Sequence, residues 1–206
     1  MIDIIFNRDN EEDFIVMAEK LGFDSLYFAN RISDERLSGL QKKTKLRLYS
    51  GCLRLFSAHG SEKNNARHIL EKTDIDLAYG MESHMEKDFM HQRNSGLNHI
   101  LCEIAAKRNK LIGISFGMLI DDTGNKLPQM MGRMKQNARL CRKYKVNLCI
   151  ASFADDPYRM RGASDLISFG VVLGMNEGEA KKALSCVEEK IREKIEGKKI
   201  EGIEEI

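Results

Sequence analysis

Short apolar runs alternate with amphipathic or charged stretches along almost the whole chain. Apolar runs of about four to eight residues are typical of buried β-strands, and apolar residues about three or four positions apart are typical of one helix face. The clearest predicted strands are 2–6, 25–29, 46–55, 75–79, 111–116 and 146–152. The predicted helices are 11–21, one that opens at Ser33, 62–72, 97–109, 128–144, 164–172 and a long one from about Asn176.

This alternation predicts a parallel sheet covered by helices, because consecutive parallel strands need a crossover connection. About seven strands and no change to an all-helical half favour a TIM-barrel-like α/β barrel over an open sheet. With 206 residues the chain is short for such barrels, which have roughly 200 to more than 400, so we expect a degenerate or missing unit. Residues 1–187 are expected to form one barrel-like domain. Residues 188–206, mostly Glu, Lys, Ile and Gly, are expected to be a helix end and a charged, frayed tail.

The overall charge does not point to a nucleic acid, because a net charge of +2 gives no global field. Any nucleic-acid contact must therefore depend on a local patch. No signal peptide and no apolar run of roughly 20 residues is visible, so we expect no membrane association. The five cysteines are odd in number and widely spaced, which predicts reduced thiols, no zinc site and a cytoplasmic location.

A parallel barrel carries catalytic groups at the carboxyl ends of its strands. The polar residues predicted there are Asn7, Arg8, Asp9, Asn30, Arg31, His59, Glu82, His84, Ser115 and Ser152. The five histidines never fall two or four positions apart, so the paired imidazoles of a metal-dependent hydrolase are missing, and no glycine-rich phosphate loop occurs. We therefore predict no catalytic residue, metal or cofactor bound by the chain itself. The alternative is a barrel hydrolase with a degenerate metal site.

One segment, 128–150, is basic throughout and contains no acidic residue. At 100° per residue its apolar side chains form one arc, and four cations gather on the opposite arc. Like charges on one helix face repel one another, and an anionic partner would relieve that repulsion. We expect this basic face to contact RNA phosphates or a partner protein; the alternative is a solvated face. The basic face consists of Lys135, Arg139, Arg142 and Lys143.

Arg133 and Asn137 fall inside the apolar arc of the same helix. Because a buried guanidinium is expensive unless paired, they are expected either to join an internal polar network or to contact a partner directly. Arg159 and Arg161, in the loop after the last strand, are candidate phosphate contacts unless Asp155 or Asp156 pairs with them. Arg93 is a further candidate, followed by Ser95 as a possible helix cap.

Four stretches in this order resemble a known family, ribonuclease P protein component 3, which includes the 30-kilodalton subunit of eukaryotic ribonuclease P. They are residues 93–102, 131–137, 141–146 and 161–175. The last is the most specific, with Arg161, then Asp165-Leu166-Ile167-Ser168, then Gly174-Met175. The resemblance covers roughly residues 2 to 187, and the matched stretches cluster after Tyr79.

The resemblance implies a TIM-barrel fold related to metal-dependent phosphoesterases but without their metal-ligand histidines. It also implies a subunit of the endoribonuclease that removes the 5′ leader from precursor tRNA, in which the RNA, with magnesium, carries out the hydrolysis. The implied partners are ribonuclease P RNA, precursor tRNA through the holoenzyme, and other ribonuclease P proteins, especially component 2. The family pattern supplies no catalytic residue. The run that begins at Asp165 is expected to pack and to cap a helix.

Overall fold

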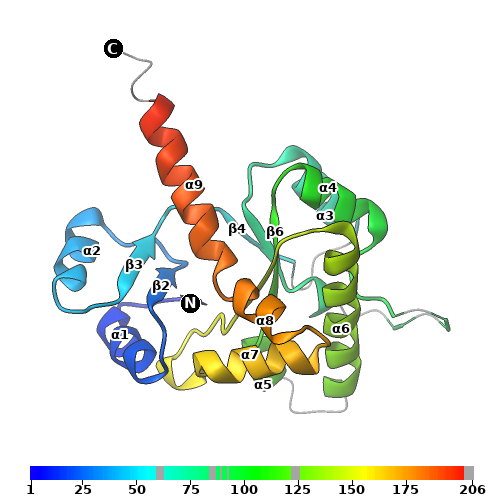
Figure 1. Ribbon diagram of the computed structural model, residues 1–206, viewed down its shortest axis with the longest axis horizontal. Coiled ribbons are helices and arrows are strands. Elements are labelled where there is room, and N and C mark those ends of the chain that lie inside the picture. The colour runs from blue at the N-terminus through cyan, green and yellow to red at the C-terminus, as the bar shows by residue number, and fades with distance from the viewer. Residues whose placement is uncertain (59–62, 84–86, 89, 92, 122–125, 202–206) are drawn as a thin grey trace.

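Parallel strands form the centre of the molecule (Figure 1). The computed structural model describes residues 1–58, 63–83, 87–88, 90–91, 93–121 and 126–201. Within these residues one sheet has the order β1-β2-β3, formed by Ile2–Ile5, Ser25–Phe28 and Arg47–Ser50. The other has the order β4-β5-β6-β7, formed by Leu55–Ser57, Leu77–Tyr79, Leu111–Ser115 and Leu148–Ala151.

Helices follow most of the strands, as the alternating pattern predicts. They are α1 (Glu11–Lys20), α2 (Asp34–Gln41), α3 (Lys63–Lys72), α4 (His99–Lys107), α5 (Gly117–Asp121), α6 (Leu127–Tyr144), α7 (Ala163–Val172), α8 (Glu177–Ala183) and α9 (Cys186–Glu201). Two 3-10 turns, η1 (Met81–Ser83) and η2 (Pro157–Arg159), follow β5 and β7. None of the helices in the described residues is long and apolar enough to span a bilayer.

The two sheets close into a barrel on one side. Ile5, at the end of β1, forms an isolated parallel bridge with Ala154, just after β7. The amide of Phe6 donates to the Ala154 carbonyl at 2.8 Å. The expected TIM-barrel-like α/β fold is confirmed.

The other side of the barrel holds the degenerate unit. The prediction of a single strand over 46–55 is wrong: β3 ends at Ser50, and β4 begins in the other sheet at Leu55. Gly51 has a positive φ of 68°, which a strand cannot continue through, and no helix separates the two strands. No backbone hydrogen bonds pair β3 with β4 in the described structure. The Tyr27 hydroxyl makes the connection on this side: it accepts from the Leu53 amide and donates to the Leu53 carbonyl, each at 2.9 Å.

Side chains alternate between the barrel interior and the helical layer, as expected for strands buried on both faces. Ile2 and Ile4 of β1 pack inside the barrel with Leu77 and Leu111. Ile5 packs outside, in the layer with α1, α7 and α8. Both layers are built almost entirely from aliphatic and aromatic residues, so the interior is a packed core rather than a channel.

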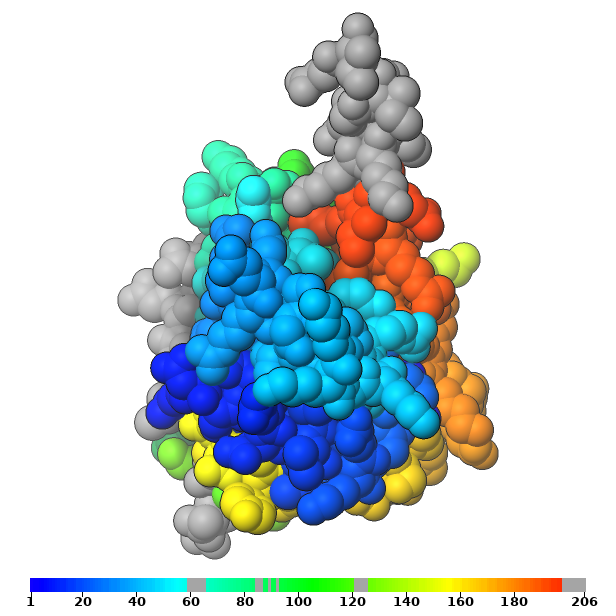
Figure 2. Space-filling view, turned by 90° about the vertical axis from the view of Figure 1, so that its left-hand side faces the viewer, coloured from blue at the N-terminus to red at the C-terminus, as the bar shows by residue number. Residues whose placement is uncertain are grey.

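Helix α9 covers the amino end of the barrel and lies between the two groups of strands (Figure 1). Figure 2 shows its orange and red surface beside the cyan part of the chain. The long helix predicted from Asn176 is in fact two, because the chain turns at residues 184–185 between α8 and α9. Cys186, Val187 and Ile191 of α9 belong to the interior apolar cluster. The region expected to fray from residue 188 therefore begins as a packed helix that continues to Glu201.

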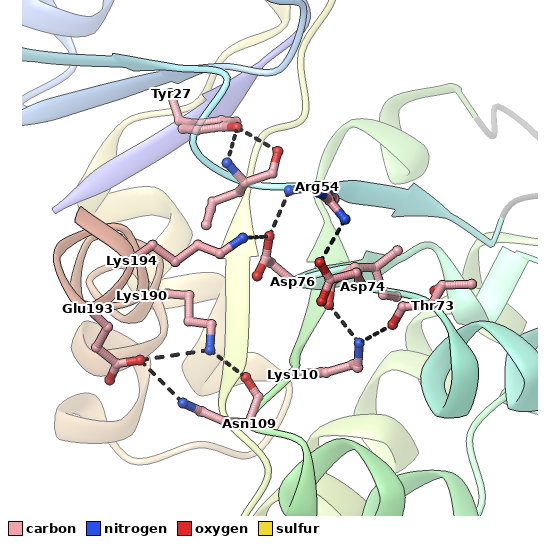
Figure 3. A network of polar contacts seen from close by, with 12 residues as sticks. Tyr27, Arg54, Thr73, Asp74, Asp76, Asn109, Lys110, Lys190, Glu193 and Lys194 are labelled. Carbon is pink, nitrogen blue, oxygen red and sulfur yellow. Dashed lines mark hydrogen bonds and ion pairs between the residues drawn. The ribbon is translucent and has the colours of Figure 1, made fainter. Parts of the chain in front are cut away.

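Polar contacts fix α9 to the amino ends of three strands, and Figure 3 shows those beside β5 and β6. The ammonium of Lys194 contacts the Asp76 carboxylate, before β5, at 2.5 Å. The ammonium of Lys190 donates to the Asn109 carbonyl, before β6, at 2.8 Å. Buried Glu188 pairs with Arg47, at the start of β3, at 3.0 Å. These contacts and the apolar ones place the first half of α9 where a barrel would otherwise be open.

Candidate functional site

Aromatic rings occupy the carboxyl end of the barrel, where barrel enzymes place their catalytic groups. Tyr79 and Phe153 stack with ring centroids 4.3 Å apart, and Phe6 lies 6.1 Å from Tyr79. Tyr79 and Phe153 are buried, and the three rings come from the ends of β5, β7 and β1. The mouth of the barrel is thus filled by apolar side chains.

Ser152, directly after β7, and Asp3 of β1 link the two strands at which the barrel closes. The Ser152 hydroxyl donates to the Asp3 carboxylate at 2.5 Å, and the Ser152 amide donates to its other oxygen at 2.6 Å. Complete burial raises the pKa of Asp3 to about 6, although hydrogen bonds from Ser152 and the Ile4 amide act to lower it. Both residues are 0% exposed, so no substrate reaches them in this conformation.

Several of the other strand-end candidates in the described residues contact neighbouring loop residues. Asn30 donates to the Asn7 carbonyl, and Asn7 donates to the Glu11 carboxylate at 2.8 Å. Asp9 pairs with Arg36, and Ser115 is buried. Arg8 pairs at 3.5 Å with Asp155, Arg31 is exposed, and His59 and His84 lie outside the described residues. No group of three or more His, Cys, Asp or Glu in the described part of the chain lies close enough to hold a metal ion.

Helix α6 instead presents a buried polar cluster on the side that faces η1. Arg133, with a side chain 4% exposed, contacts the Asp88 carboxylate through Nε at 2.8 Å. Its Nη1 donates to the Glu82 carbonyl at 3.1 Å. Asn137 is 0% exposed and donates to the Ser95 carbonyl at 3.1 Å. The predicted burial of Arg133 and Asn137 is confirmed. Both side chains belong to an internal polar network, which is one of the two alternatives that the sequence left open.

Two oxygens in this cluster have no partner in the described structure: Oε1 of Glu82 and Oδ1 of Asn137. Complete burial raises the pKa of Glu82 to about 7, against hydrogen bonds from its own backbone and Asn137 that act to lower it. Protonated Glu82 would supply the one donor that this arrangement lacks. The charged groups of the cluster include Arg133 and Arg93, which contact the Asp88 carboxylate at 2.8 Å and 3.6 Å.

The stretches with the clearest resemblance contact one another around this cluster. The guanidinium of Arg93 lies directly against Gly132 of α6, where any Cβ would collide with it. Gln136 donates to the Arg93 carbonyl and to the Ser95 hydroxyl, each at 3.0 Å. The suggestion that Ser95 caps the next helix is wrong, because Asn98 caps α4 by accepting from the Leu101 amide. Ser95 is instead buried against α6.

The cations of the basic face divide into two kinds. Lys135, Arg139 and Lys143 are exposed and contact no carboxylate in the described residues. Arg142 instead makes a two-pronged contact with Glu179 of α8, through Nε at 2.8 Å and Nη2 at 2.7 Å. Hydrogen bonding to Glu179 raises the pKa of Arg142, and the same contact lowers the pKa of Glu179. Arg142 is therefore also a connection between α6 and α8.

The two arginines after β7 are also engaged within the chain. Arg159 contacts the Asp155 carboxylate at 2.9 Å, the alternative that the sequence left open. Arg161 donates to the Met160 carbonyl at 2.7 Å, and its guanidinium lies 5.7 Å from the centre of the Phe116 ring. Tyr158, between them, is 83% exposed. Neither arginine is as available for a phosphate as the cations of α6.

A family model described as RNase P subunit p30 matches residues 32–199, which is most of the chain. The chain belongs to the RNase P subunit p30 family. Its relatives include ribonuclease P protein component 3 of Methanosarcina mazei, 34% identical over 66% of this chain and 54% of that protein. The same component of Methanosarcina acetivorans is 32% identical over 65% of this chain and 52% of that protein. The matches thus span about half the length of these relatives.

A solved structure shares the fold of this p30-family chain. It is a chain of the cryo-EM structure of archaeal ribonuclease P with mature tRNA. The two superpose with a TM-score of 0.77 at 21% identity, over 94% of this chain and 91% of that one.

The run that begins at Asp165 packs and caps a helix, as expected. Asp165 accepts from the Gly162 amide at 3.2 Å in a capping arrangement, and Leu166 is fully buried. Sequence reasoning missed Asp88 and Glu179, the two acids that pair with α6. No local pattern marks them, because each lies far from its partner along the chain.

Proposed function

We propose that this chain is a protein subunit of ribonuclease P, which assists the catalytic RNA in removing the 5′ leader from precursor tRNA. The observation that carries the proposal is the exposed group Lys135, Arg139 and Lys143 on a helix whose other face is rigidly packed. Cations that contact no carboxylate favour an anionic partner, and a helix fixed by Arg133 and Asn137 presents them in one orientation. Membership of the p30 family supports the same conclusion.

In this proposal the RNA, with magnesium, performs the phosphodiester hydrolysis, and the chain binds and orients RNA. The partners are ribonuclease P RNA, precursor tRNA within the holoenzyme, and other ribonuclease P proteins, especially component 2. The chain itself supplies neither a catalytic residue nor a metal or cofactor site. The filled barrel mouth supports this division of roles. All five cysteines are free, which favours a reducing compartment and hence the cytoplasm.

The test is reconstitution of leader cleavage from ribonuclease P RNA and its companion proteins, with and without this chain, across a magnesium titration. We expect the chain to lower the magnesium concentration at which the precursor is cleaved. The triple variant Lys135→Ala, Arg139→Ala, Lys143→Ala should lose much of this effect. A control with three exposed lysines changed elsewhere, Lys20→Ala, Lys42→Ala, Lys107→Ala, should retain it.

The alternative function, a stand-alone metal-dependent phosphoesterase, predicts a different result from the same preparation. The chain alone, with magnesium, manganese or zinc, would then hydrolyse phosphodiesters, and a point substitution would abolish the turnover. That result, or cleavage by the RNA that is indifferent to the chain, would overturn the proposed function.

A further inference from the structure

A hollow of about 280 Å³ lies between the last turn of α6 and α8. Its floor is apolar, and its rim carries three cations and one carboxylate. The rim is formed by Arg142, Lys145, Lys182 and Glu179, and the floor includes Ala138, Cys141, Leu148, Met175 and Ala183. Sites for whole small molecules have about 300 to 1,000 Å³, so this hollow suits a smaller unit such as one sugar-phosphate.

The charges of the rim are not balanced. Glu179 is already engaged by Arg142, and it also accepts from the Asn176 amide at 2.8 Å. Lys145 and Lys182 are exposed, and neither contacts a carboxylate in the described part of the chain. Lys181, the neighbour of Lys182, is different because it pairs with Glu177 at 2.6 Å. Two positive charges therefore remain at the hollow without a counter-charge.

Arg142 is held in place and still has donors available. Its Nε and Nη2 are used by Glu179 and by the Gly174 carbonyl, which accepts from Nη2 at 2.6 Å. Nη1 donates to no described residue, and the side chain is 47% exposed. A guanidinium already fixed by a carboxylate loses little conformational freedom when it binds a phosphate. Glu179 thus acts as a positioning residue for Arg142.

The hollow continues the line of exposed cations on α6. Lys135, Arg139 and Arg142 are four and three positions apart, so they lie along one side of the helix. Lys135 approaches Gly174, in the turn between α7 and α8, and Arg142 bonds to the carbonyl of that same residue. The hollow therefore lies where this line of cations meets α8.

We propose that the hollow binds one phosphate of the RNA backbone, through Lys145, Lys182 and Arg142, with the attached ribose against the apolar floor. The proposal rests on the proposed function, since it names where RNA bound by this chain enters between α6 and α8. The excess of positive charge selects an anion, and the fit to one sugar-phosphate unit selects the RNA backbone over a large ligand. The helical pattern of α6 does not predict a phosphate contact by Lys145 or Lys182, because Lys145 directly follows α6 and Lys182 belongs to α8.

The test is the salt dependence of binding of the full chain to ribonuclease P RNA, followed by fluorescence anisotropy. The variant is Lys145→Gly with Lys182→Ala. Glycine is chosen because Lys145 has a φ of 56°, a conformation that glycine adopts without strain, so the change removes charge without breaking the helix end. The matched control, Lys20→Ala with Lys42→Ala, removes the same net charge from exposed sites away from the hollow. Unchanged thermal melting checks that both variants are folded.

Loss of one phosphate contact should reduce the slope of log affinity against log salt by about 0.7 to 0.9 and weaken binding several-fold at about 0.15 M salt. The control should keep the wild-type slope, and Lys182→Arg should keep most of the affinity. A wild-type slope in the double variant, or an equal loss in the control, would overturn the hollow as a phosphate site. Failure of the hollow is distinct from failure of the proposed function, because in the first case the chain still supports leader cleavage in the reconstituted enzyme.

Discussion

Replacing Arg133 by alanine should destabilise the protein far more than replacing Arg139, although both are cations of α6. Arg133 has a side chain that is 4% exposed and pairs with Asp88 at 2.8 Å, whereas Arg139 is exposed. Removing one member of a buried pair typically costs about 3–5 kcal/mol, because the other charge is left uncompensated. Since Asp88 keeps 22% of its side chain exposed, we expect about 3 kcal/mol, the lower end of that range.

For a chain of this length, 1 kcal/mol corresponds to a shift of about 2–4 °C in melting temperature. Arg133→Ala should therefore melt about 6–12 °C below the wild type, measured by circular dichroism and checked by urea unfolding. Arg139→Ala should change the free energy of unfolding by no more than about 0.5 kcal/mol, as is usual for exposed positions. The double variant Arg133→Ala, Asp88→Ala should cost less than the sum of the single changes, because the two residues interact directly.

The same pair has a pH signature. Partial burial acts to raise the pKa of Asp88, but hydrogen bonds from Arg133 and the Asn94 amide, with the charge of Arg133, outweigh it and hold the pKa below its usual value. A lowered pKa in the folded state gives stability that is present above the unfolded pKa and lost as the pH falls through the folded one. The difference in the free energy of unfolding between the wild type and Arg133→Ala should therefore become smaller at acidic pH. Equal melting of Arg133→Ala and Arg139→Ala at neutral pH would refute this reasoning.

Two further stability predictions concern buried carboxylates. Burial raises the pKa of Glu82 to about 7 from 4.5, so ionisation of Glu82 destabilises the fold increasingly as the pH rises between these values. Glu82→Gln should therefore raise the melting temperature at pH 8, with a gain of at most about 3 kcal/mol in the free energy of unfolding. At pH 4 the same substitution should have little effect. Melting curves across that range with the same pH dependence for both proteins would contradict it. Glu188→Ala should lower the free energy of unfolding by about 1.5–3 kcal/mol, measured in urea, because it removes the buried partner of Arg47 and Arg192. The control is Glu189→Ala, at the exposed neighbouring position. Equal losses of stability in the two variants would contradict a stabilising role for these α9 contacts.

The local pattern of the chain determined the class of fold and the inner face of α6. Apolar alternation identified the strands, and a parallel arrangement followed because helical segments separate most of them. The helical phase of 128–144 placed Arg133 and Asn137 among apolar neighbours, and the structure buries both. These inferences succeed because periodicity is a property of residues close together in sequence, which share one strand or one helix.

Tertiary structure alone decided which charged side chains are paired and where α9 packs. Arg133 and Asp88 are 45 positions apart, and Arg142 and Glu179 are 37 apart, so each pairing depends on which helices and loops come together. The sequence therefore grouped Arg142 with Arg139, although only Arg142 has a carboxylate from α8 beside it. The same holds for α9, whose composition predicted a helix end that frays into a solvated tail. A few buried residues, Val187 and Ile191 among them, fit the open amino end of a barrel with a degenerate unit, and no local periodicity encodes that vacancy.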